Sequence, residues 1–480
     1  MQFLRPENEH KELTYNDVFL MPQYSDVRSR MDVDLSPVDK IGTTIPIVVA
    51  NMTAVAGRRM AETVTRRGGL VVLPQDMSLE RIAEIVKYVK ARDHVIETPV
   101  VLSESESVQT ALNLIHKRSH RAVIITDAEN HPVGIFTEKD AWRHDRYRIL
   151  KDVMVQDVIT LSSKLTQKEM YSQLLERRIS IAPVVNDDGS LIGVMTRKGA
   201  VRASMYKPAL NAGGELLTCA AVRIRSDLEK TITQYKNIGV DVIVLDTAHG
   251  HQERMLDAIR KARQILGPDH TLVAGNIVTV QAAEAFIKAG ASILKVGVGP
   301  GAACKTRMMT GVGRPQFSAV HRVARFARKH GVHVWADGGC KHPRDVVLAL
   351  AAGASSAMVG TWFAGTYESP ADVNRDEQGR FYKEQFGMAS SRAVANRYNN
   401  EDSFEIQKRA IFDEGSSQSK MYLKSGSESV EDILDQITAG LRSACTYSGA
   451  NDLRSFYEKA IVGVQTSSGY TEGKPVNQSW

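Results

Sequence analysis

The sequence predicts an α/β protein built on a TIM (β/α)8 barrel that is interrupted by a smaller inserted domain. Short apolar runs alternate with helix-like segments along most of the chain, which is typical of parallel α/β folds. There are eight such runs, the number of strands in a TIM barrel. Between the second and third runs, an internal repeat breaks the alternation.

Two predicted strands precede the repeat and six follow it. They cover residues 45–52, 70–74, 216–224, 240–248, 271–277, 292–299, 332–339 and 355–363. Segments with helical periodicity separate them, as in 78–92, where Ile82, Ile85, Val86 and Val89 would share one face. We therefore expect a barrel made of residues 1–92 and 207–480, which includes a C-terminal segment, and an inserted domain at 93–206.

The inserted segment contains two copies of one pattern. Leu102 matches Leu161 and Thr137 matches Thr196, each pair 59 positions apart, and the glycines at 134 and 193 match in the same way. Each copy predicts a strand, an amphipathic helix, a strand, a turn and a strand. The turns at 130–132 and 187–189 have the composition of hairpin turns. Two copies are too few for a solenoid, so we expect one compact domain.

Composition excludes several classes of protein. A chain of 480 residues with 43% hydrophobic and 24% charged residues fits a globular protein of two or three domains. The net charge of +6 is spread among residues of both signs, so we expect no nucleic-acid partner. No run reaches the ~18 apolar residues of a membrane span, and the N-terminus has no apolar signal region. The four cysteines form no CxxC pair, so we expect no disulfide or structural zinc, and a cytoplasmic location.

The loop around Cys304 is the strongest candidate for chemistry. It follows the sixth predicted strand, and in a TIM barrel the chemistry lies at the carboxyl ends of strands. Glycines precede the cysteine and allow the backbone to bend close to a ligand. Lys305 and Arg307 are nearby cations that could stabilise a nucleophilic thiolate. The alternative is a small apolar residue in a turn, since most free cysteines are buried and inert.

Glycines at the ends of late strands predict a phosphate site. They occur in ADGG (336–339), MVGTWFAG (358–365) and EQFGMASS (384–391). Exposed backbone N–H groups beside a helix N-terminus bind phosphate well. Asp246 and Asp337 also follow strands, where they could reach hydroxyl groups or a polar ring, although either could instead cap a helix.

Six motifs together resemble the IMP dehydrogenase/GMP reductase family over nearly the whole chain. They are TYNDVFLMPQYS (14–25), GVGPGAACKTRMMTGVGRPQ (297–316), WADGG (335–339), MVGTWFAGTYESP (358–370), FGMASS (386–391) and DEGSS (413–417). The repeat resembles a tandem pair of CBS domains, a Bateman module, which this family carries at this place. The resemblance implies a purine 5′-monophosphate as substrate, a nicotinamide cofactor, and attack of Cys304 on C2 of the purine.

The resemblance also implies which residues bind each group. The substrate would contact Asn51, Met52, Ala302, Asp337, Gly338, Gly339, Gly360, Thr361, Gln385, Gly387, Met388 and Glu414. The cofactor would contact Asp246, Thr247, Asn276, Gly297, Val298 and Gly299. Carbonyl groups of Gly299, Gly301 and Cys304 would line a site for a monovalent cation such as K⁺.

The CBS resemblance implies ATP or GTP as a regulatory ligand, with Thr137, Asp140 and Thr196 as contacts. An aspartate after the Thr-x-x step often binds ribose in such domains. Asp140 fits that position in the first copy, whereas Gly199 replaces it in the second, so we expect one nucleotide site rather than two. The alternative is a structural insertion without a ligand.

The direction of the reaction is the open question of this resemblance. In the reductases, a threonine two residues after the cysteine and a glutamate handle ammonia, and Thr306 and Glu414 match them, although dehydrogenases share both types. Arg397 and Tyr398, in a predicted mobile flap over 389–413, could be the pair that activates water in dehydrogenases or an unrelated dipeptide.

Two features point in opposite directions. Asn51 before Met52 resembles the reductases, whereas the CBS pair is missing from short reductases. The combination resembles the bacterial GMP reductases that carry CBS domains. We therefore expect a GMP reductase of purine salvage that uses NADPH to convert GMP into IMP and ammonia. IMP dehydrogenase is the alternative, and a non-catalytic purine nucleotide sensor is a second one.

The chain departs from the family pattern at three places. Ala302 replaces a serine of the cysteine loop, and Gln385 replaces a tyrosine. The Glu-Ser-His that completes the cation site from a neighbouring subunit is not evident in QTSSGYTEG (465–473), so a bound cation would be held differently. The resemblance finally implies a homotetramer, or an octamer joined through the CBS pair.

Overall fold

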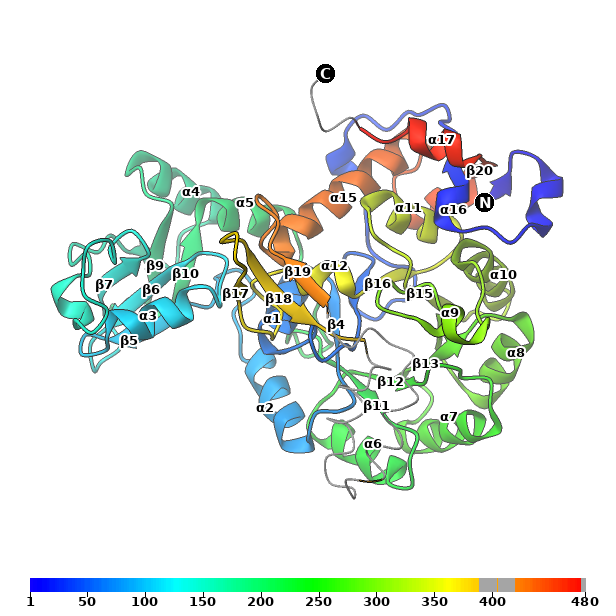
Figure 1. Ribbon diagram of the computed structural model, residues 1–480, viewed down its shortest axis with the longest axis horizontal. Coiled ribbons are helices and arrows are strands. Elements are labelled where there is room, and N and C mark those ends of the chain that lie inside the picture. The colour runs from blue at the N-terminus through cyan, green and yellow to red at the C-terminus, as the bar shows by residue number, and fades with distance from the viewer. Residues whose placement is uncertain (388–403, 405–418, 476–480) are drawn as a thin grey trace.

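A closed barrel of eight parallel strands forms the centre of the computed structural model (Figure 1), which describes residues 1–387, 404 and 419–475. Hydrogen-bonded neighbours follow the order β11-β12-β13-β14-β15-β16-β3-β4, so the two strands before the insertion close the barrel. The strands are β3 (Ile47–Val49), β4 (Leu70–Leu73), β11 (Cys219–Val222), β12 (Val242–Asp246), β13 (Thr271–Ile277), β14 (Ile293–Val296), β15 (His333–Asp337) and β16 (Ser356–Val359). All eight predicted strands are confirmed.

Helices surround the barrel, as Figure 1 shows. The helix that follows β4 buries Ile82, Ile85, Val86 and Val89, the face that their spacing predicts. The larger helices are α1 (Arg58–Arg66), α2 (Leu79–Lys90), α6 (Leu228–Asn237), α7 (Glu253–Leu266), α8 (Val280–Ala289), α10 (Gln316–Arg328), α11 (Pro343–Ala351) and α15 (Val430–Tyr447). Two short helices, α9 (Thr306–Thr310) and α12 (Thr361–Ala364), follow β14 and β16.

The interior of the barrel is packed with side chains. Val72, Val244, Trp335 and Met358 belong to one buried apolar cluster within the ring of strands. Trp335 is completely buried, and its indole N–H donates to Oδ2 of Asp39 at 3.3 Å. Because the core is filled, a ligand can reach only the rim, and chemistry in this fold lies on the carboxyl-end loops.

Smaller elements cover the barrel's edges. Strands β1 (Gln2–Phe3), β20 (Ile461–Val464) and β2 (Val18–Leu20) form one sheet, and β17 (Asn374–Arg375), β18 (Phe381–Gln385) and β19 (Ser419–Tyr422) form another. Helices α16 (Leu453–Lys459) and α17 (Ser467–Glu472) flank β20. Four 3₁₀ turns complete the described elements: η1 (Pro6–His10), η2 (Tyr15–Asp17), η3 (Arg30–Asp32) and η4 (Leu150–Asp152).

The inserted repeat forms two three-stranded units, which confirms the element order predicted for each copy. The first unit contains β5 (Val100–Ser103), α3 (Val108–Ile115), β6 (Ala122–Thr126) and β7 (Pro132–Thr137). The second contains β8 (Leu161–Ser162), α4 (Gln167–Glu176), β9 (Ile181–Val185) and β10 (Leu191–Thr196), and α5 (Arg197–Met205) leads back to the barrel. In Figure 1 the two units lie together on one side of the barrel.

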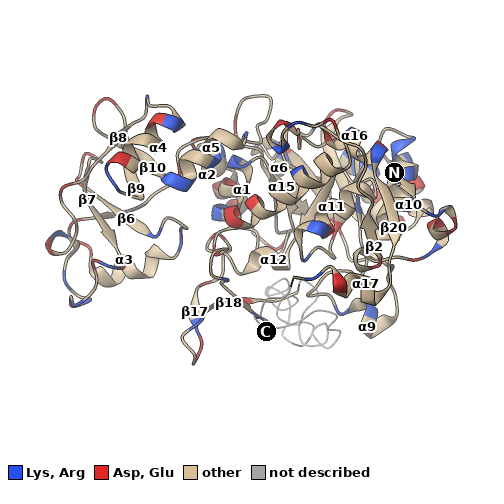
Figure 2. Cartoon of the chain, turned by 90° about the horizontal axis from the view of Figure 1, so that it is seen from above, with Lys and Arg blue, Asp and Glu red and all other residues tan. Residues whose placement is uncertain are grey.

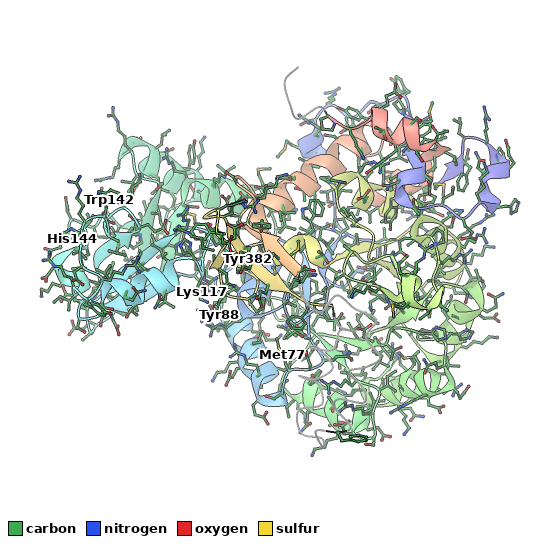
Figure 3. The ribbon with its side chains drawn as sticks, in the orientation of Figure 1. Met77, Tyr88, Lys117, Trp142, His144 and Tyr382 are labelled. Atoms are coloured by element: carbon green, nitrogen blue, oxygen red, sulfur yellow. The ribbon has the colours of Figure 1, made fainter. Side chains whose placement is uncertain are left out.

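Charged side chains join the inserted units to the barrel. Arg118 pairs with Glu62 of α1 and donates to the Tyr88 hydroxyl at 3.0 Å, while Lys117 pairs with Asp372. Figure 3 shows Lys117 and Tyr88 at this junction. Figure 2 shows basic and acidic residues interspersed along both parts of the chain, as the mixed charge of the sequence predicts.

Two further observations bear on the composition. All four cysteines are free thiols; Cys219 and Cys445 are buried, whereas Cys304 is exposed. Among the residues that the structure describes, no helix combines the length and apolar character needed to cross a membrane.

Candidate active site

A cavity of about 300 Å³ opens at the carboxyl end of the barrel. This volume is at the lower end of the range for small-molecule sites. The cavity brings together every described residue predicted for substrate, cofactor or catalysis except Gln385. Its lining includes Asn51, Met52, Asp246, Thr247, Asn276, Gly297, Val298, Gly299, Gly301, Ala302, Cys304, Thr306, Asp337, Gly338, Gly339, Gly360, Thr361 and Gly387.

Cys304 lies at the tip of the loop between β14 and α9. Its backbone N–H donates to the carbonyl of Gly301 at 3.1 Å, which holds the turn. Its thiol lies 3.2 Å from Oγ1 of Thr306 and donates to that hydroxyl. The side chain is exposed, so Cys304 is not the buried apolar turn residue of the alternative interpretation.

Arg307 supports this loop through its aliphatic stem. Gly299 has a φ of +84°, and a Cβ built there would lie 2.2 Å from Cγ of Arg307. A side chain at 299 would therefore meet both backbone strain and a collision. The glycine lets the arginine stem pack directly against the backbone that precedes Cys304.

Lys295 is the residue that sequence reasoning missed. It belongs to β14, and its side chain is only 3% exposed. Its ammonium lies 2.7 Å from Oδ1 of Asp246 and 2.7 Å from Oδ2 of Asp337. The signal was a lysine inside the apolar run SILKVGVG, because a buried lysine needs charged partners.

The surroundings of Lys295 keep it charged. Burial alone would lower the pKa of its ammonium, but the charges of Asp246 and Asp337, and their hydrogen bonds, outweigh burial and raise the pKa above its ordinary value. Gly275 on the neighbouring strand makes room, since a Cβ there would lie 2.5 Å from Cβ of Lys295. The lysine therefore joins two strand-end carboxylates into one rigid group.

Two asparagines extend this group. The side-chain amide of Asn51 donates to Oδ2 of Asp246 at 2.8 Å. That of Asn276 donates to Oδ2 of Asp337 at 2.9 Å and to the carbonyl of Gly297 at 2.6 Å. None of the residues that the structure describes donates a hydrogen bond to the buried Oδ1 of Asn276, which leaves an acceptor on a residue that lines the cavity. Such an acceptor fits a ligand that brings a hydrogen-bond donor.

The glycine pair after β15 lies beside the cysteine loop. Gly338 and Gly339 have φ values of +92° and +86°. A Cβ on Gly338 would lie 3.1 Å from Cγ of Pro300, and one on Gly339 would lie 3.2 Å from the Tyr15 ring. Both positions combine a left-handed backbone with close neighbours, and they leave backbone groups accessible at the strand end, as a phosphate site requires.

The strand end after β16 holds another of the glycines predicted for phosphate. Gly360 precedes α12, and a Cβ there would lie 2.7 Å from Sδ of Met52. Gln385 lies next to the first residue of α12, and its side-chain amide donates to Oγ1 of Thr361 at 2.9 Å. The interpretation of Gln385 as a residue that lines the cavity is therefore not supported; it reaches the cavity only through Thr361.

Four residues predicted for the site lie outside the described part of the chain. They are Met388, Arg397, Tyr398 and Glu414. The same holds for the predicted flap at 389–413, of which only Phe404 is described.

The regulatory candidates lie at the ends of β7 and β10. Oδ2 of Asp140 accepts hydrogen bonds from the backbone and the hydroxyl of Thr137 at 2.7 and 2.8 Å. Thr196 accepts from the backbone N–H of Gly199 at 2.8 Å. Thr196 also lines a second, larger cavity of about 1130 Å³ between the inserted units and the barrel.

The comparisons with known proteins address the whole chain. The family model described as "IMP dehydrogenase / GMP reductase domain" matches residues 12–476. The chain belongs to the IMP dehydrogenase/GMP reductase family. GMP reductase of Mycobacterium tuberculosis is 50% identical over 480 residues, which cover 100% of both chains. The inosine-5′-monophosphate dehydrogenase of Nitrosopumilus maritimus is 35% identical and covers 97% of this chain and 98% of its own length.

Solved structures of this oxidoreductase family agree with the fold. A variant GMP reductase of Trypanosoma brucei in complex with guanosine 5′-monophosphate superposes with a TM-score of 0.67 and 29% identity, covering 98% of each chain. The T. brucei enzyme in complex with guanosine 5′-triphosphate gives a TM-score of 0.58 at 28% identity and covers 95% of this chain and 98% of that one.

Proposed function

We propose that this protein is a GMP reductase that converts GMP into IMP and ammonia, with hydride from NADPH, in purine salvage. The observation that carries the proposal is the contact between Cys304 and Thr306 in the cavity at the carboxyl end of the barrel. The chain is also 50% identical over its full length to a protein named GMP reductase. The contact places a nucleophile next to a hydroxyl that can relay a proton to a leaving group.

The chain's own residues account for the first half of the reaction. The Cys304 thiolate adds to C2 of the purine, and the bond from C2 to the exocyclic nitrogen then breaks. The leaving nitrogen takes up a proton and departs as ammonia, and Thr306 lies where it can pass that proton. A thioimidate remains on Cys304. Splitting one difficult displacement into two steps is the usual gain of covalent catalysis.

The second half regenerates the thiolate. A bound NADPH would be the source of the hydride that C2 takes up. The bond from C2 to the sulfur of Cys304 then breaks, which releases IMP and returns the thiolate. The residues fit such a cofactor, because Asn276 offers a buried acceptor that has no partner in the described part of the chain, and the Gly297–Gly299 backbone lines the cavity. Asp246, Thr247 and Val298 line it as well, so we assign all six residues to the cofactor side.

We expect the substrate to bind along the carboxyl-end rim of the barrel, where the glycines and carboxylates lie. We assign phosphate and ribose to Asp337, Gly338, Gly339, Gly360, Thr361 and Gly387, with Asn51, Met52 and Ala302 near the base. The Lys295 bridge fixes the Asp337 carboxylate in one orientation. Because Asp337 already accepts two hydrogen bonds, its side chain is pre-organised for a ribose hydroxyl.

Regulation and assembly complete the proposal. We infer that residues 93–206 are a CBS pair that binds ATP or GTP near Thr137, Asp140 and Thr196, and that the protein forms a homotetramer or an octamer. A monovalent cation near Gly299, Gly301 and Cys304 stays a prediction. The carbonyl of Gly301 already accepts the Cys304 N–H, and its second lone pair would be available to the ion.

IMP dehydrogenase is the second candidate, because relatives of that name are 35% and 36% identical over nearly the whole chain. The decisive experiment compares NADPH oxidation with GMP against NAD reduction with IMP. We expect NADPH oxidation with GMP and release of ammonia. NADH formation from IMP would contradict the reductase proposal, and nucleotide binding without either activity would leave the sensor as the explanation.

A further inference from the structure

Gln75 lines the active-site cavity but lies outside the six family motifs. It follows β4, and the N–H of Met77 donates to the carbonyl of Pro74 at 3.3 Å. Gln75 and Asp76 are therefore the central residues of a tight turn. This turn stands at the carboxyl end of a barrel strand, which is where functional groups lie in this fold.

The turn is anchored to the neighbouring strand end. Oγ1 of Thr53 donates to Oδ2 of Asp76 at 2.6 Å. Thr53 follows Met52, which lines the cavity, so the loop after β3 and the turn after β4 are tied together. Pro74, before the turn, is buried, and its ring restricts the backbone. Gln75 is thus held at one place on the rim.

The side-chain oxygen of Gln75 is an unused acceptor. Oε1 is buried, and no described residue donates a hydrogen bond to it. Among the described residues that line the cavity, only Asn276 has another such atom. A buried amide oxygen without a donor is costly and therefore uncommon. On a residue that lines a cavity, it indicates a ligand that brings the donor.

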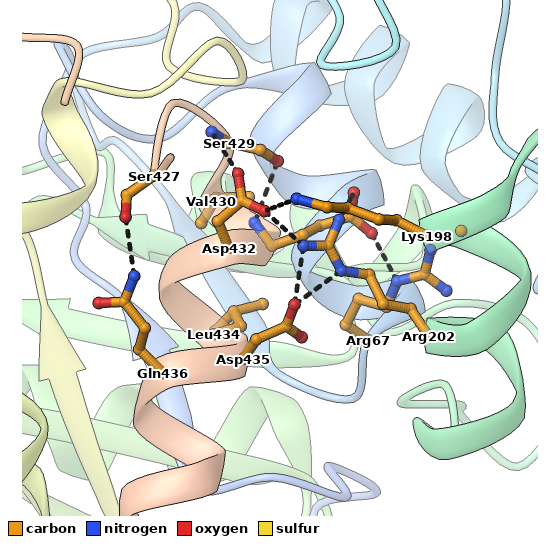
Figure 4. A network of polar contacts seen from close by, with 12 residues as sticks. Arg67, Lys198, Arg202, Ser427, Ser429, Val430, Asp432, Leu434, Asp435 and Gln436 are labelled. Carbon is orange, nitrogen blue, oxygen red and sulfur yellow. Dashed lines mark hydrogen bonds and ion pairs between the residues drawn. The ribbon is translucent and has the colours of Figure 1, made fainter. Parts of the chain in front are cut away.

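A buried polar side chain elsewhere in the chain shows the usual, paired state. The three guanidinium nitrogens of Arg202 donate to Asp435, Glu431 and Asp432 at 2.9, 3.4 and 2.6 Å. Figure 4 shows Arg202 beside Asp432 and Asp435 of α15. Arg202 finds its acceptors within the chain, whereas the acceptor of Gln75 faces a cavity large enough for a ligand.

The order of the strands decides which part of a ligand reaches Gln75. In the closed barrel, β4 and β14 are four strands apart in either direction, so Gln75 lies across the mouth from the Cys304 loop. On one side, two and three strands away, are β12 with Asp246 and β13 with Asn276, which we assign to the cofactor. On the other side is β3, followed by Asn51, which we assign near the base. Gln75 therefore lies between the two groups of residues.

Three kinds of donor could satisfy this oxygen: the amine on C2 of the purine, a sugar hydroxyl and the carboxamide N–H of the nicotinamide. The amine is bonded to the carbon that Cys304 attacks, and Cys304 lies on the opposite side of the mouth. Sugar hydroxyls have the carboxylates of Asp246 and Asp337 as acceptors on the same rim. The carboxamide is the donor left for a neutral amide oxygen between base and cofactor.

We propose that Gln75 accepts a hydrogen bond from the carboxamide of the nicotinamide and thereby orients the ring toward the purine. The hydride leaves the ring carbon next to the one that bears the carboxamide, so fixing the carboxamide fixes the reacting carbon. Gln75 is a positioning residue in this role. The inference rests on the proposed function and adds a residue to its cofactor side.

The first test measures binding rather than turnover. NADPH is titrated by calorimetry into the full-length protein saturated with IMP, with which NADPH does not react. Gln75→Met removes the acceptor and keeps the length of the side chain. We expect NADPH to bind about tenfold more weakly, the usual effect of losing one neutral hydrogen bond, and GMP to bind as before. Gln234→Met on the outer helix α6 is the matched control and should change neither affinity.

A cofactor analogue identifies the donor. The reduced 3-acetylpyridine analogue of NADPH keeps the ring and a carbonyl group but has no N–H on that group. The unchanged protein should prefer NADPH over the analogue, and this preference should fall about tenfold in Gln75→Met. A sugar hydroxyl as the donor would weaken both cofactors equally and leave the preference unchanged, which would overturn the proposal.

Other results would also overturn it. Unchanged NADPH affinity in Gln75→Met would exclude the hydrogen bond, and weaker binding of GMP alone would assign the oxygen to the purine amine. If Gln75→Met does not fold, Gln75→Ala is measured in its place with the same expectations.

Failure of the proposed function would appear differently, as no NADPH oxidation with GMP in the unchanged protein. If the chain reduces NAD with IMP instead, the same titrations are made with NADH and its 3-acetylpyridine analogue. NADH carries the same carboxamide, so each outcome supports or overturns the role of Gln75 as before.

Discussion

The ammonium of Lys295 lies 2.7 Å from Oδ2 of Asp337 at the carboxyl end of the barrel, with the lysine side chain almost completely buried. The pair joins β14, which leads into the Cys304 loop, to β15, which ends at the glycine pair. It therefore fixes the nucleophile's strand relative to the strand that we assign to ribose. Four predictions test this geometry and the chemistry proposed from it, and a fifth concerns a buried lysine of β18.

Replacing Lys295 should destabilise the fold. Lys295→Met leaves Asp246 and Asp337 facing one another without their shared cation, and loss of one partner of a buried pair typically costs about 3 kcal/mol or more. We expect that loss in the free energy of unfolding measured with urea. Lys288→Met is the control, because Lys288 forms an exposed pair with Glu284, and should change little. Equal unfolding curves for both variants would contradict the role of Lys295.

Cys304→Ala should abolish turnover and keep substrate binding. The side chain is exposed, so its truncation leaves no cavity in the core. We expect no detectable NADPH oxidation with GMP, whereas calorimetric titration still detects GMP. Substantial remaining activity would exclude the covalent mechanism.

Thr306→Val should slow the reaction without unfolding the loop. The substitution keeps the shape of the side chain and removes the hydroxyl that contacts Cys304 at 3.2 Å. Loss of a proton-transfer group typically reduces turnover by about 10²–10⁴-fold, and we expect this in kcat. Thr310→Val in the same helix is the control, because the Thr310 hydroxyl bonds to the backbone of Thr306 and Val312. A similar kcat in both variants would argue against Thr306 as the proton relay.

Gly338→Ala should weaken substrate binding more than stability. The new Cβ meets Pro300 at 3.1 Å and the backbone N of Gly301 at 3.2 Å, so the cysteine loop must shift. We expect the KM for GMP to rise about tenfold, which corresponds to about 1.4 kcal/mol. Gly331 has a similar positive φ of +69°, but a Cβ there would meet no described residue within 4 Å. Gly331→Ala should therefore cost about 1 kcal/mol of stability and leave KM unchanged. An unchanged KM for Gly338→Ala would refute the close contact with the site.

Lys383 should make stability depend on pH. Burial, followed by the charge of Arg59, lowers the pKa of Lys383 to about 7, and its amine bonds to the carbonyls of Tyr367 and Ser369. The unfolded chain, with a pKa near 10.4, binds the proton more tightly than the folded protein. The free energy of unfolding should therefore rise between about pH 7 and pH 10, by up to about 1.4 kcal/mol per pH unit from this group.

The variant Lys383→Met isolates that contribution. We expect it to lose this rise, which is measured as the difference between its urea unfolding curves and those of the unchanged protein at pH 7, 8 and 9. Lys420→Met on the adjacent strand β19 is the control, because Lys420 is exposed. The same slope in the protein with and without Lys383 would show that this amine titrates normally.

Much of the fold and the site could be predicted because the signals are local. Each barrel strand is a short apolar run, and each loop with glycines follows such a run, so both are visible in a few consecutive residues. The rim residues then share one location because parallel strands in a closed barrel end on the same side. The family motifs suggested a role for each position, and the cavity brings together the described ones other than Gln385.

Contacts between residues far apart in the sequence could not be predicted from such local patterns. Lys295 lies 49 positions from Asp246 and 42 from Asp337. The three side chains come into contact because β12, β13, β14 and β15 pair side by side in the barrel. Gln385 stands at the motif position of a tyrosine, but its side chain hydrogen-bonds to Thr361 and does not line the cavity. The antiparallel pairing of β18 with β19 sets its orientation.

The amino-acid pattern alone was sufficient for the barrel, the repeat and the candidate nucleophile, since apolar periodicity and loop composition are properties of short segments. The buried side-chain oxygen of Gln75 at the cavity and the cation between two aspartates came only from the folded chain. Both depend on strand register and on contacts between segments far apart in sequence, which no local pattern encodes.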